Sequence, residues 1–226
     1  MKKGKLYAIG IGPGDPELLT LKAVRIIRES DVISVPRGKD KGESLALAIV
    51  EGAVDLTGKK ILDTHFPMTK GSQRDALMPA AEEILGYLND GSDVAFITLG
   101  DPVLYSTFFH LYDSLLALSP DVNVEIVPGV SSINAAGARA GVSLALASEK
   151  LAIVPATYMK DVRKVLEDFE TVVLMKVFRV IDELSVVLKE MGLYERAIYV
   201  SRVGLDGEVV KPLSEIGEEE LNYFSI

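Results

Sequence analysis

Two glycine-rich turns follow apolar segments of the sequence, and such turns can hold a small ligand. The first is Gly-Ile-Gly-Pro-Gly-Asp at residues 10–15, and the second is Gly-Asp-Pro at residues 100–102. Glycine lets a backbone approach a ligand closely, and open α/β sheets bind ligands at the turns that end their strands. The second turn would also place the carboxylate of Asp101 beside the ligand, next to Gly100.

The first turn is a poor match to a dinucleotide site. Its pattern departs from G-x-G-x-x-G, Pro13 has no N–H to donate, and the carboxylate of Asp15 would repel a phosphate. A purely structural interpretation also stays open for both turns. Thr20 could cap a helix after the first turn, and Ser106 or Thr107 could cap a helix after the second.

A third segment, Pro-Gly-Val-Ser-Ser at residues 128–132, opens a stretch of small residues. It does not match the nucleophile pattern G-x-S-x-G, because Ile133 stands at the last glycine position. Ser131 and Ser132 are therefore more simply explained as helix caps, unless another motif joins them.

The titratable side chains offer few other candidates. His65 and His110 are the only histidines, and neither has the spacing of a metal ligand, so the sequence predicts no metal bound by the protein. His65 follows a predicted strand and is the better functional candidate of the two. Basic side chains in two loops after predicted strands could receive a polyanionic ligand; they are Arg37, Lys39, Lys70 and Arg74.

The elements that must position these residues alternate along the chain. In the first half, apolar runs predict strands over residues 6–11, 32–35, 60–62 and 94–99, and helical spacing predicts helices over 20–30, 44–50, 76–88 and 106–118. Pro36 is expected to end the second strand. This alternation predicts an α/β architecture with a mostly parallel sheet in the first domain.

The second half suggests a mixed sheet. Strands are predicted over 124–127, 151–154, 171–177 and 197–201, with a hairpin over 201–212 that centres on Asp206-Gly207. Helices are predicted over 131–141, 161–168 and 180–191. We place the boundary near residue 120, which gives an N-terminal α/β domain over 1–119 and a C-terminal α/β domain over 120–226.

Composition excludes several classes of protein. The chain of 226 residues has no cysteine, which excludes disulfides, thiol nucleophiles and thiolate metal sites. Its net charge of −9 disfavours nucleic acid and anionic membranes as partners. No apolar run approaches the length of a membrane span, about 18 residues, and no signal segment is evident. We expect a soluble, cytoplasmic enzyme or small-molecule binder.

Taken together, the three segments carry a resemblance that spans essentially the whole chain. Residues 10–23, Gly-Asp-Pro-Val-Leu-Tyr-Ser-Thr at 100–107 and Pro-Gly-Val-Ser-Ser at 128–132 occur in the order and spacing of tetrapyrrole methylases. Within that superfamily, these motifs and Pro-Met-Thr-Lys at 67–70 resemble the C-20 methyltransferases of cobalamin biosynthesis, which act on precorrin-2 or cobalt-factor II. One departure is Gly71, where the family has an acidic residue.

The resemblance implies a two-domain homodimer that binds S-adenosylmethionine in the cleft between its domains, with the tetrapyrrole in a trough beside the first-domain loops. Carried over residue by residue, the cofactor contacts are Pro13, Gly100, Asp101, Val103, Tyr105, Ser106, Ser131, Ser132, Met175, Val200 and Ser201. The substrate contacts would come from Arg37, Lys39, His65, Lys70 and Arg74. A ligand without phosphate also explains why Pro13 and Asp15 are tolerated in the first turn.

The implied reaction is an in-line displacement in which a nucleophilic meso carbon attacks the sulfonium methyl, so catalysis would consist mainly of positioning. His65, Tyr105 or water could remove the proton, and the sequence assigns no catalytic residue. Two alternatives stay open. One is another methylase on this fold, acting at a different ring position or in diphthine synthesis. The other is a non-catalytic small-molecule-binding module.

Overall fold

The computed structural model describes residues 3–37, 44–66, 73–158 and 161–226. They form two compact units, which divide between Ser131 and Ser132. The sequence placed this boundary near residue 120. The division falls later because strand β5 (Val124–Val127) pairs with β1 (Leu6–Gly10) and so belongs to the first unit.

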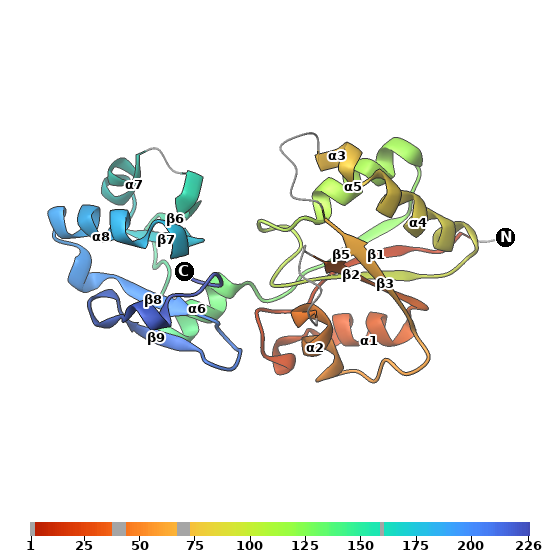
Figure 1. Ribbon diagram of the computed structural model, residues 1–226, viewed down its shortest axis with the longest axis horizontal. Coiled ribbons are helices and arrows are strands. Elements are labelled where there is room, and N and C mark those ends of the chain that lie inside the picture. Colours follow the sequence, from red (N-terminus) through yellow and green to blue (C-terminus); the bar gives the residue numbers. More distant parts are fainter. Residues whose placement is uncertain (1–2, 38–43, 67–72, 159–160) are drawn as a thin grey trace. The chain divides into compact units, whose positions relative to one another are not determined.

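The first unit is a parallel five-stranded sheet between two layers of helices (Figure 1). The strand order is β3-β2-β4-β1-β5, with β2 at Val32–Arg37, β3 at Lys60–His65 and β4 at Val94–Thr98. Helices α1 (Leu21–Glu29) and α2 (Leu45–Glu51) cover one face. Helices α3 (Gln73–Ala76), α4 (Met78–Asn89) and α5 (Phe108–Leu118) cover the other. The parallel α/β architecture predicted for this half is confirmed.

Burial explains why the central strands are continuous apolar runs. Every residue of β4 is buried, because helices cover both faces of the sheet. Phe96 of β4 packs between Phe108 of α5 and Phe66, with ring centroids 5.6 and 6.0 Å away. This aromatic cluster anchors the strand whose carboxyl end carries the second glycine turn.

Strand β2 continues past Pro36, and the expectation that proline ends it is wrong. β2 pairs with β3 as far as Arg37 opposite His65, but with β4 only as far as Ser34 opposite Phe96. The backbone carbonyl of Arg37 accepts from Phe66 on the β3 side, so position 36 faces the other side, where pairing has already ended. A proline there removes no hydrogen bond.

The second unit contains both strand orientations. Strands β6 (Leu151–Pro155) and β7 (Thr171–Met175) pair in parallel, and β8 (Ile198–Ser201) and β9 (Val209–Pro212) pair antiparallel. Helices α6 (Ser132–Ala140), α7 (Val162–Asp168) and α8 (Ile181–Glu190) pack with them. The predicted hairpin forms, but its connection spans residues 202–208 rather than a two-residue turn.

The helices of both units are short. Within the described ranges, none is long and apolar enough to cross a membrane.

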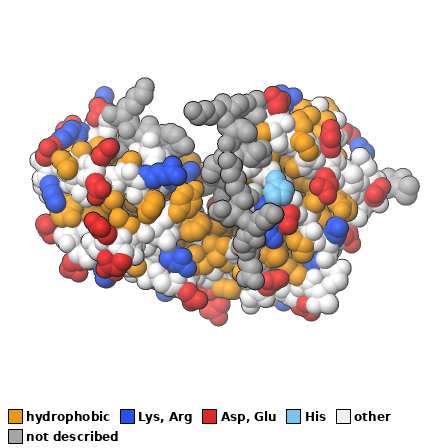
Figure 2. Space-filling view, in the orientation of Figure 1, with side chains coloured by type: hydrophobic (Ala, Val, Ile, Leu, Met, Phe, Trp, Pro, Cys, Tyr) orange, Lys and Arg blue, Asp and Glu red, His pale blue; other side chains and the backbone are white. Residues whose placement is uncertain are grey.

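Figure 2 shows acidic and basic side chains interspersed on the visible face, so the excess negative charge is not gathered there into one block.

Candidate functional site

The two glycine turns meet at the carboxyl edge of the sheet. Strands β1 and β4 are neighbours, with Gly10 opposite Thr98. Beyond them, the Gly100 N–H donates to the Gly12 carbonyl oxygen at 2.8 Å, and the Gly12 N–H donates back to Gly100 at 3.3 Å. Both glycines have a positive φ, +80° and +68° respectively, which favours glycine. Two motifs that lie about ninety residues apart in sequence therefore form one surface.

The third segment joins them through Gly129, which follows β5 on the other side of β1. A Cβ on Gly10 would lie 2.6 Å from the Gly100 oxygen and 2.7 Å from the Gly129 nitrogen. A Cβ on Gly129 would lie 2.7 Å from the Gly10 carbonyl carbon. From the sequence, glycine in the first two turns was explained by close approach to a ligand. The close approach that the structure contains is between the three turns themselves.

Asp101 ties the second and third turns together. Its Oδ2 accepts from the Gly129 N–H at 2.9 Å, and its Oδ1 accepts from the Val103 N–H at 2.8 Å. Because both carboxylate oxygens already accept a backbone amide, the first role of this side chain is to fix the shape of the turns. Each oxygen has a second lone pair, so the carboxylate can still accept from a bound molecule.

The residues after Asp101 present apolar surface beside it. The side chains of Val103 and Tyr105 are 63% and 46% exposed. Tyr105 has a φ of +53°, a left-handed conformation that is strained for a residue with a side chain and clusters at functional sites. The Ser106 hydroxyl lies 3.1 Å from the Thr98 hydroxyl and accepts from the Phe108 N–H, so Ser106 supports the start of α5.

The first turn has its own internal support. Pro13 is buried, and the Asp15 carboxylate accepts from the Glu17 N–H at 2.9 Å, which starts a short 3-10 helix over Pro16–Leu18. Thr20 caps α1, as predicted, by accepting from the Ala23 N–H at 3.1 Å. The Asp15 carboxylate therefore caps the short helix by accepting a backbone N–H.

The remaining cofactor candidates lie where the first unit ends and in the second unit. Ser131 is the last residue of the first unit and is buried, and Ser132 begins α6. Met175 ends β7, whereas Val200 and Ser201 lie buried at the end of β8.

Ser201 forms a backbone bridge with Ser225, and both hydroxyls are buried, at 1% and 4% residue exposure. Among the described residues, neither hydroxyl has a hydrogen-bond partner. Orphaned hydroxyls of this kind fit a ligand that supplies the missing partner.

The basic candidates are only partly brought together. Arg37 is the last residue of β2 rather than part of a loop, and its Nε contacts the Asp63 carboxylate of β3 at 2.7 Å. His65 is exposed opposite Arg37 at the same sheet edge. Arg74 lies in α3, not in a loop, and is exposed. Lys39 and Lys70 lie outside the described residues.

The sequence missed three residues that the structure singles out. In the first unit, the Thr98 hydroxyl supports Ser106 and the Gly129 amide holds Asp101. In the second unit, the buried Ser225 hydroxyl has no hydrogen-bond partner among the described residues. Thr98 could have been found as the polar residue that ends an apolar strand. The other two depend on long-range pairing. Across the described residues, His, Asp and Glu side chains form no group of three that could hold a metal ion.

The family model for tetrapyrrole (corrin/porphyrin) methylases matches residues 5–217, which includes all three turns. The chain belongs to this family. The matched residues include the turns that converge at the sheet edge, and the structure contains a two-unit α/β fold.

Three relatives whose names give a C(20) methyltransferase match nearly the whole chain. A cobalt-precorrin-2 C(20)-methyltransferase of Salmonella typhimurium is 36% identical, with 98% of this chain and 94% of the relative covered. A probable cobalt-precorrin-2 C(20)-methyltransferase of Methanocaldococcus jannaschii is 38% identical over the same shares. A precorrin-2 C(20)-methyltransferase of Sinorhizobium is 31% identical, with 99% and 94% covered.

Solved structures of tetrapyrrole methylases share the fold. A cobalt precorrin-4 methyltransferase superposes with a TM-score of 0.74 at 20% identity, covering 98% of this chain and 92% of that one. A uroporphyrin-III C-methyltransferase of Thermus thermophilus, complexed with S-adenosylhomocysteine, gives a TM-score of 0.63 at 24% identity and covers 97% and 93%.

Proposed function

We propose that this tetrapyrrole methylase transfers a methyl group from S-adenosylmethionine to C-20 of precorrin-2 or of its cobalt-containing counterpart, cobalt-factor II, in cobalamin biosynthesis. The observation that carries the proposal is the match over nearly the whole chain to relatives named for this C(20) reaction. The convergence of the three glycine turns supports it, because Val103 and Tyr105 are exposed next to the Asp101 carboxylate, which can still accept a hydrogen bond.

S-adenosylmethionine supplies an electrophilic methyl group on a cationic sulfonium. We propose that the first unit holds it through residues of the turns, which are Pro13, Gly100, Asp101, Val103, Tyr105, Ser106 and Ser131. We propose further contacts from Ser132, Met175, Val200 and Ser201 in the second unit. Two features fit such a ligand: the spare acceptor capacity of the Asp101 carboxylate, and the buried Ser201 hydroxyl that has no partner among the described residues.

The protein's share of the chemistry is positioning. The turns are fixed by reciprocal backbone bonds between Gly12 and Gly100 and by the two amides on Asp101, so little reorganisation should accompany binding. Orienting two competent reactants in this way can supply roughly 7–11 kcal/mol of the barrier. His65, Tyr105 or water would take the proton from the methylated carbon, and we assign no catalytic residue.

The tetrapyrrole substrate is a polycarboxylate, and we propose that Arg37, Lys39, His65, Lys70 and Arg74 contribute to its binding. Arg37 and His65 end adjacent strands at the sheet edge that also carries the glycine turns, which supports their assignment. The proposal includes no metal bound by the protein, so any cobalt would enter as part of the substrate.

Turnover tests the proposal directly. The purified protein should transfer label from methyl-labelled S-adenosylmethionine to precorrin-2 or cobalt-factor II, and mass and ring-position analysis should place it at C-20. Label at another ring position, or on a translation factor histidine, would favour the other methylases on this fold. No transfer to any tetrapyrrole would leave only a binding module.

Asp101→Ala tests the cofactor assignment. The variant should bind S-adenosylmethionine at least about tenfold more weakly in calorimetry, because two backbone amides lose their acceptor and the turns lose their shape. Asp55→Ala is the matched control, since Asp55 accepts from the Thr57 N–H in a similar turn far along the chain. Equal affinities for the two variants would contradict the assignment.

The homodimer and the cytoplasmic location that the family resemblance implies are also part of this proposal. Light scattering on the purified protein tests the first of them, and a molar mass of a single chain at micromolar concentration would contradict it.

A further inference from the structure

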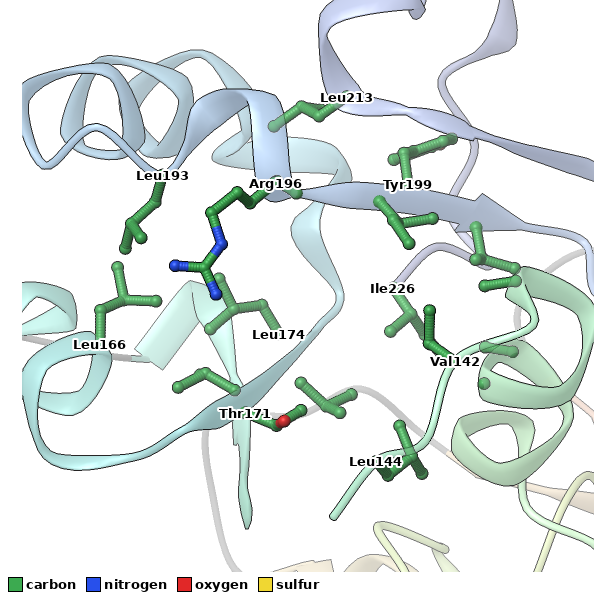
Figure 3. Close-up of a pocket in the computed structure, with 18 of the residues that line it drawn as sticks. Val142, Leu144, Leu166, Thr171, Leu174, Leu193, Arg196, Tyr199, Leu213 and Ile226 are labelled. Atoms are coloured by element: carbon green, nitrogen blue, oxygen red, sulfur yellow. The ribbon is translucent and has the colours of Figure 1, made fainter. Parts of the chain in front are cut away.

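Lys176 stands at the carboxyl end of β7, directly after Met175, the last residue of the strand. Its neighbours in sequence Leu174 and Val177 line a pocket of about 830 Å³ that lies between β7 and β8, and Figure 3 shows Leu174 among the side chains around it. Lys176 is not one of the residues that line this pocket. It therefore belongs to the edge at which the parallel strands end, and open α/β sheets bind their ligands at that edge.

The backbone of Lys176 has a conformation that a side chain disfavours. Its φ and ψ are +60° and +40°, in the left-handed region, where glycine carries no steric cost. Lys176 is also the N-cap of the short 3-10 helix over Val177–Arg179, but its side chain makes no capping hydrogen bond. The turn itself would accept glycine at least as well, which points to another use for the lysine side chain.

The Lys176 ammonium has no partner within the described part of the chain. The residue is only partly exposed, yet no ion pair or side-chain hydrogen bond between described residues includes it. A cation that leaves water without a partner costs free energy, and a bound anion would remove that cost. The strained backbone and the unpaired charge are two separate observations, and an anionic ligand accounts for both.

A second cation in the same conformation follows β8. Arg202 has a φ of +52° and is partly exposed. Its Nε donates to the Asp206 carbonyl oxygen at 2.7 Å, and no carboxylate of a described residue pairs with its guanidinium. The Lys176 N–H donates to the Ser225 carbonyl oxygen at 3.2 Å. The Arg202 N–H donates to that of the preceding residue at 2.9 Å, so the two cations follow strand ends that share one short segment.

We infer that Lys176 binds a carboxylate group of one of the two reactants, in a cationic site at the carboxyl end of β7 to which Arg202 adds positive charge. The inference rests on the proposed function, because the tetrapyrrole and the methionine part of S-adenosylmethionine both carry carboxylates. An ammonium forms short, charge-assisted hydrogen bonds with such groups. The strained backbone is then the cost in stability at which the site keeps its cation.

Lys176→Gly separates a ligand-binding role from a structural one, because the two roles predict opposite signs. Glycine relieves the left-handed strain, so the urea midpoint of unfolding should not fall. The same variant should bind one carboxylate ligand at least about tenfold more weakly in calorimetry, since it loses a charge-assisted hydrogen bond. Cobalt-factor II and S-adenosylmethionine are the two ligands to titrate.

Ala147→Gly is the matched control for the backbone. Ala147 lies in the same unit with a φ of +48°, is exposed and carries no charge, so glycine there should relieve strain without changing either affinity. Lys164→Met is the control for net charge, because it removes the same charge from the exposed side of α7. Lys176→Arg and Lys176→Met keep the strain. Arginine should restore the affinity to within about threefold, whereas methionine should bind as weakly as the glycine variant.

The ligand that binds more weakly identifies the carboxylate. Weaker binding of cobalt-factor II alone assigns Lys176 to the tetrapyrrole. Weaker binding of S-adenosylmethionine, with unchanged binding of methylthioadenosine, assigns it to the cofactor, because methylthioadenosine has the same nucleoside and no carboxylate. Either result supports the inference. Affinities equal to those of the unmodified protein for all three ligands would overturn it, and so would a lower urea midpoint together with weaker binding of all three.

The transfer assay keeps this inference separate from the proposed function. Label at C-20 with unchanged affinities of the Lys176→Gly variant would contradict the inference alone. Binding without any transfer by the unmodified protein would contradict the proposed function alone, and the affinities of the variants would still decide the role of Lys176. If the unmodified protein bound neither cobalt-factor II nor S-adenosylmethionine at millimolar concentration, both would be overturned.

Discussion

At the scale of single residues, three glycines decide whether the turns can meet. Gly10, Gly100 and Gly129 come from different parts of the chain, and their backbones approach so closely that no Cβ fits on Gly10 or Gly129. Gly129 also donates to Asp101, which links the second turn to the third. The three turns can therefore meet only because Gly10 and Gly129 have no side chain.

Gly129→Ala should be destabilising by roughly 2–4 kcal/mol, because the added methyl overlaps backbone atoms that cannot rotate away. Gly86→Ala is the matched control. Gly86 lies within α4 and nothing stands within 4 Å of its Cβ position, so alanine there should stabilise by about 0.5–1 kcal/mol. Urea unfolding of the two variants measures both effects, and a shift of the same sign in both would contradict the packing argument.

Of the three glycines, only Gly100 was predicted from the sequence as a ligand contact, and the sequence could not show that the three backbones touch one another. Strand order β4-β1-β5 places the ends of three strands side by side, and that order is set by long-range pairing. For the same reason β5 was assigned to the second domain, since only its pairing with β1 places it in the first. Local signals such as the Thr20 cap and the apolar runs were sufficient where the structure depends on neighbours in sequence.

At the scale of elements, an ion-pair group holds the edge strand β5 to its neighbours. The carboxylate of Glu125 contacts the ammonium of Lys5, just before β1, and that of Lys22 on α1, the latter at 2.6 Å. Hydrogen bonds from these two cations lower the pKa of Glu125 from 4.5 to about 2, and the bond from Lys22 has the larger effect. Ion pairs therefore connect β5, the strand that positions Gly129, to helix α1 and to the residue just before β1.

This lowered pKa determines how the stabilisation of the fold by the Glu125 ion pairs depends on pH. A carboxylate whose pKa falls on folding stabilises the fold above its unfolded pKa of 4.5, and that stabilisation is lost as the pH falls toward 2. Glu125→Gln should therefore cost about 1 kcal/mol of unfolding free energy at pH 6, and much less at pH 2.5. Urea unfolding at both values measures this. Glu83→Gln, on the exposed side of α4, should change stability little at either pH, and a pH-independent cost of Glu125→Gln would contradict the ion-pair role.

At the scale of the whole molecule, the net charge of −9 repels the proposed substrate, which is also negatively charged as a polycarboxylate. Long-range repulsion and local attraction by Arg37 and its neighbours respond to salt with opposite signs. Screening of the global charge would lower KM as salt rises, whereas screening of local cations would raise it. The Debye length is about 10 Å at 0.1 M salt, so both effects fall within an accessible range of concentrations.

We expect local attraction to dominate, because Arg37 ends β2 at the same sheet edge as the glycine turns. KM for the tetrapyrrole should rise roughly threefold or more between about 20 and 200 mM salt, with kcat unchanged. Arg37→Gln should raise KM at low salt and flatten this dependence, since it removes a cation and leaves the Asp63 carboxylate behind. Arg25→Gln is the matched control, because Arg25 pairs with Glu29 on α1 in the same way without being a substrate candidate. If KM falls with salt in the unmodified protein, the negative field of the whole molecule governs the encounter and the basic residues do not form the substrate site.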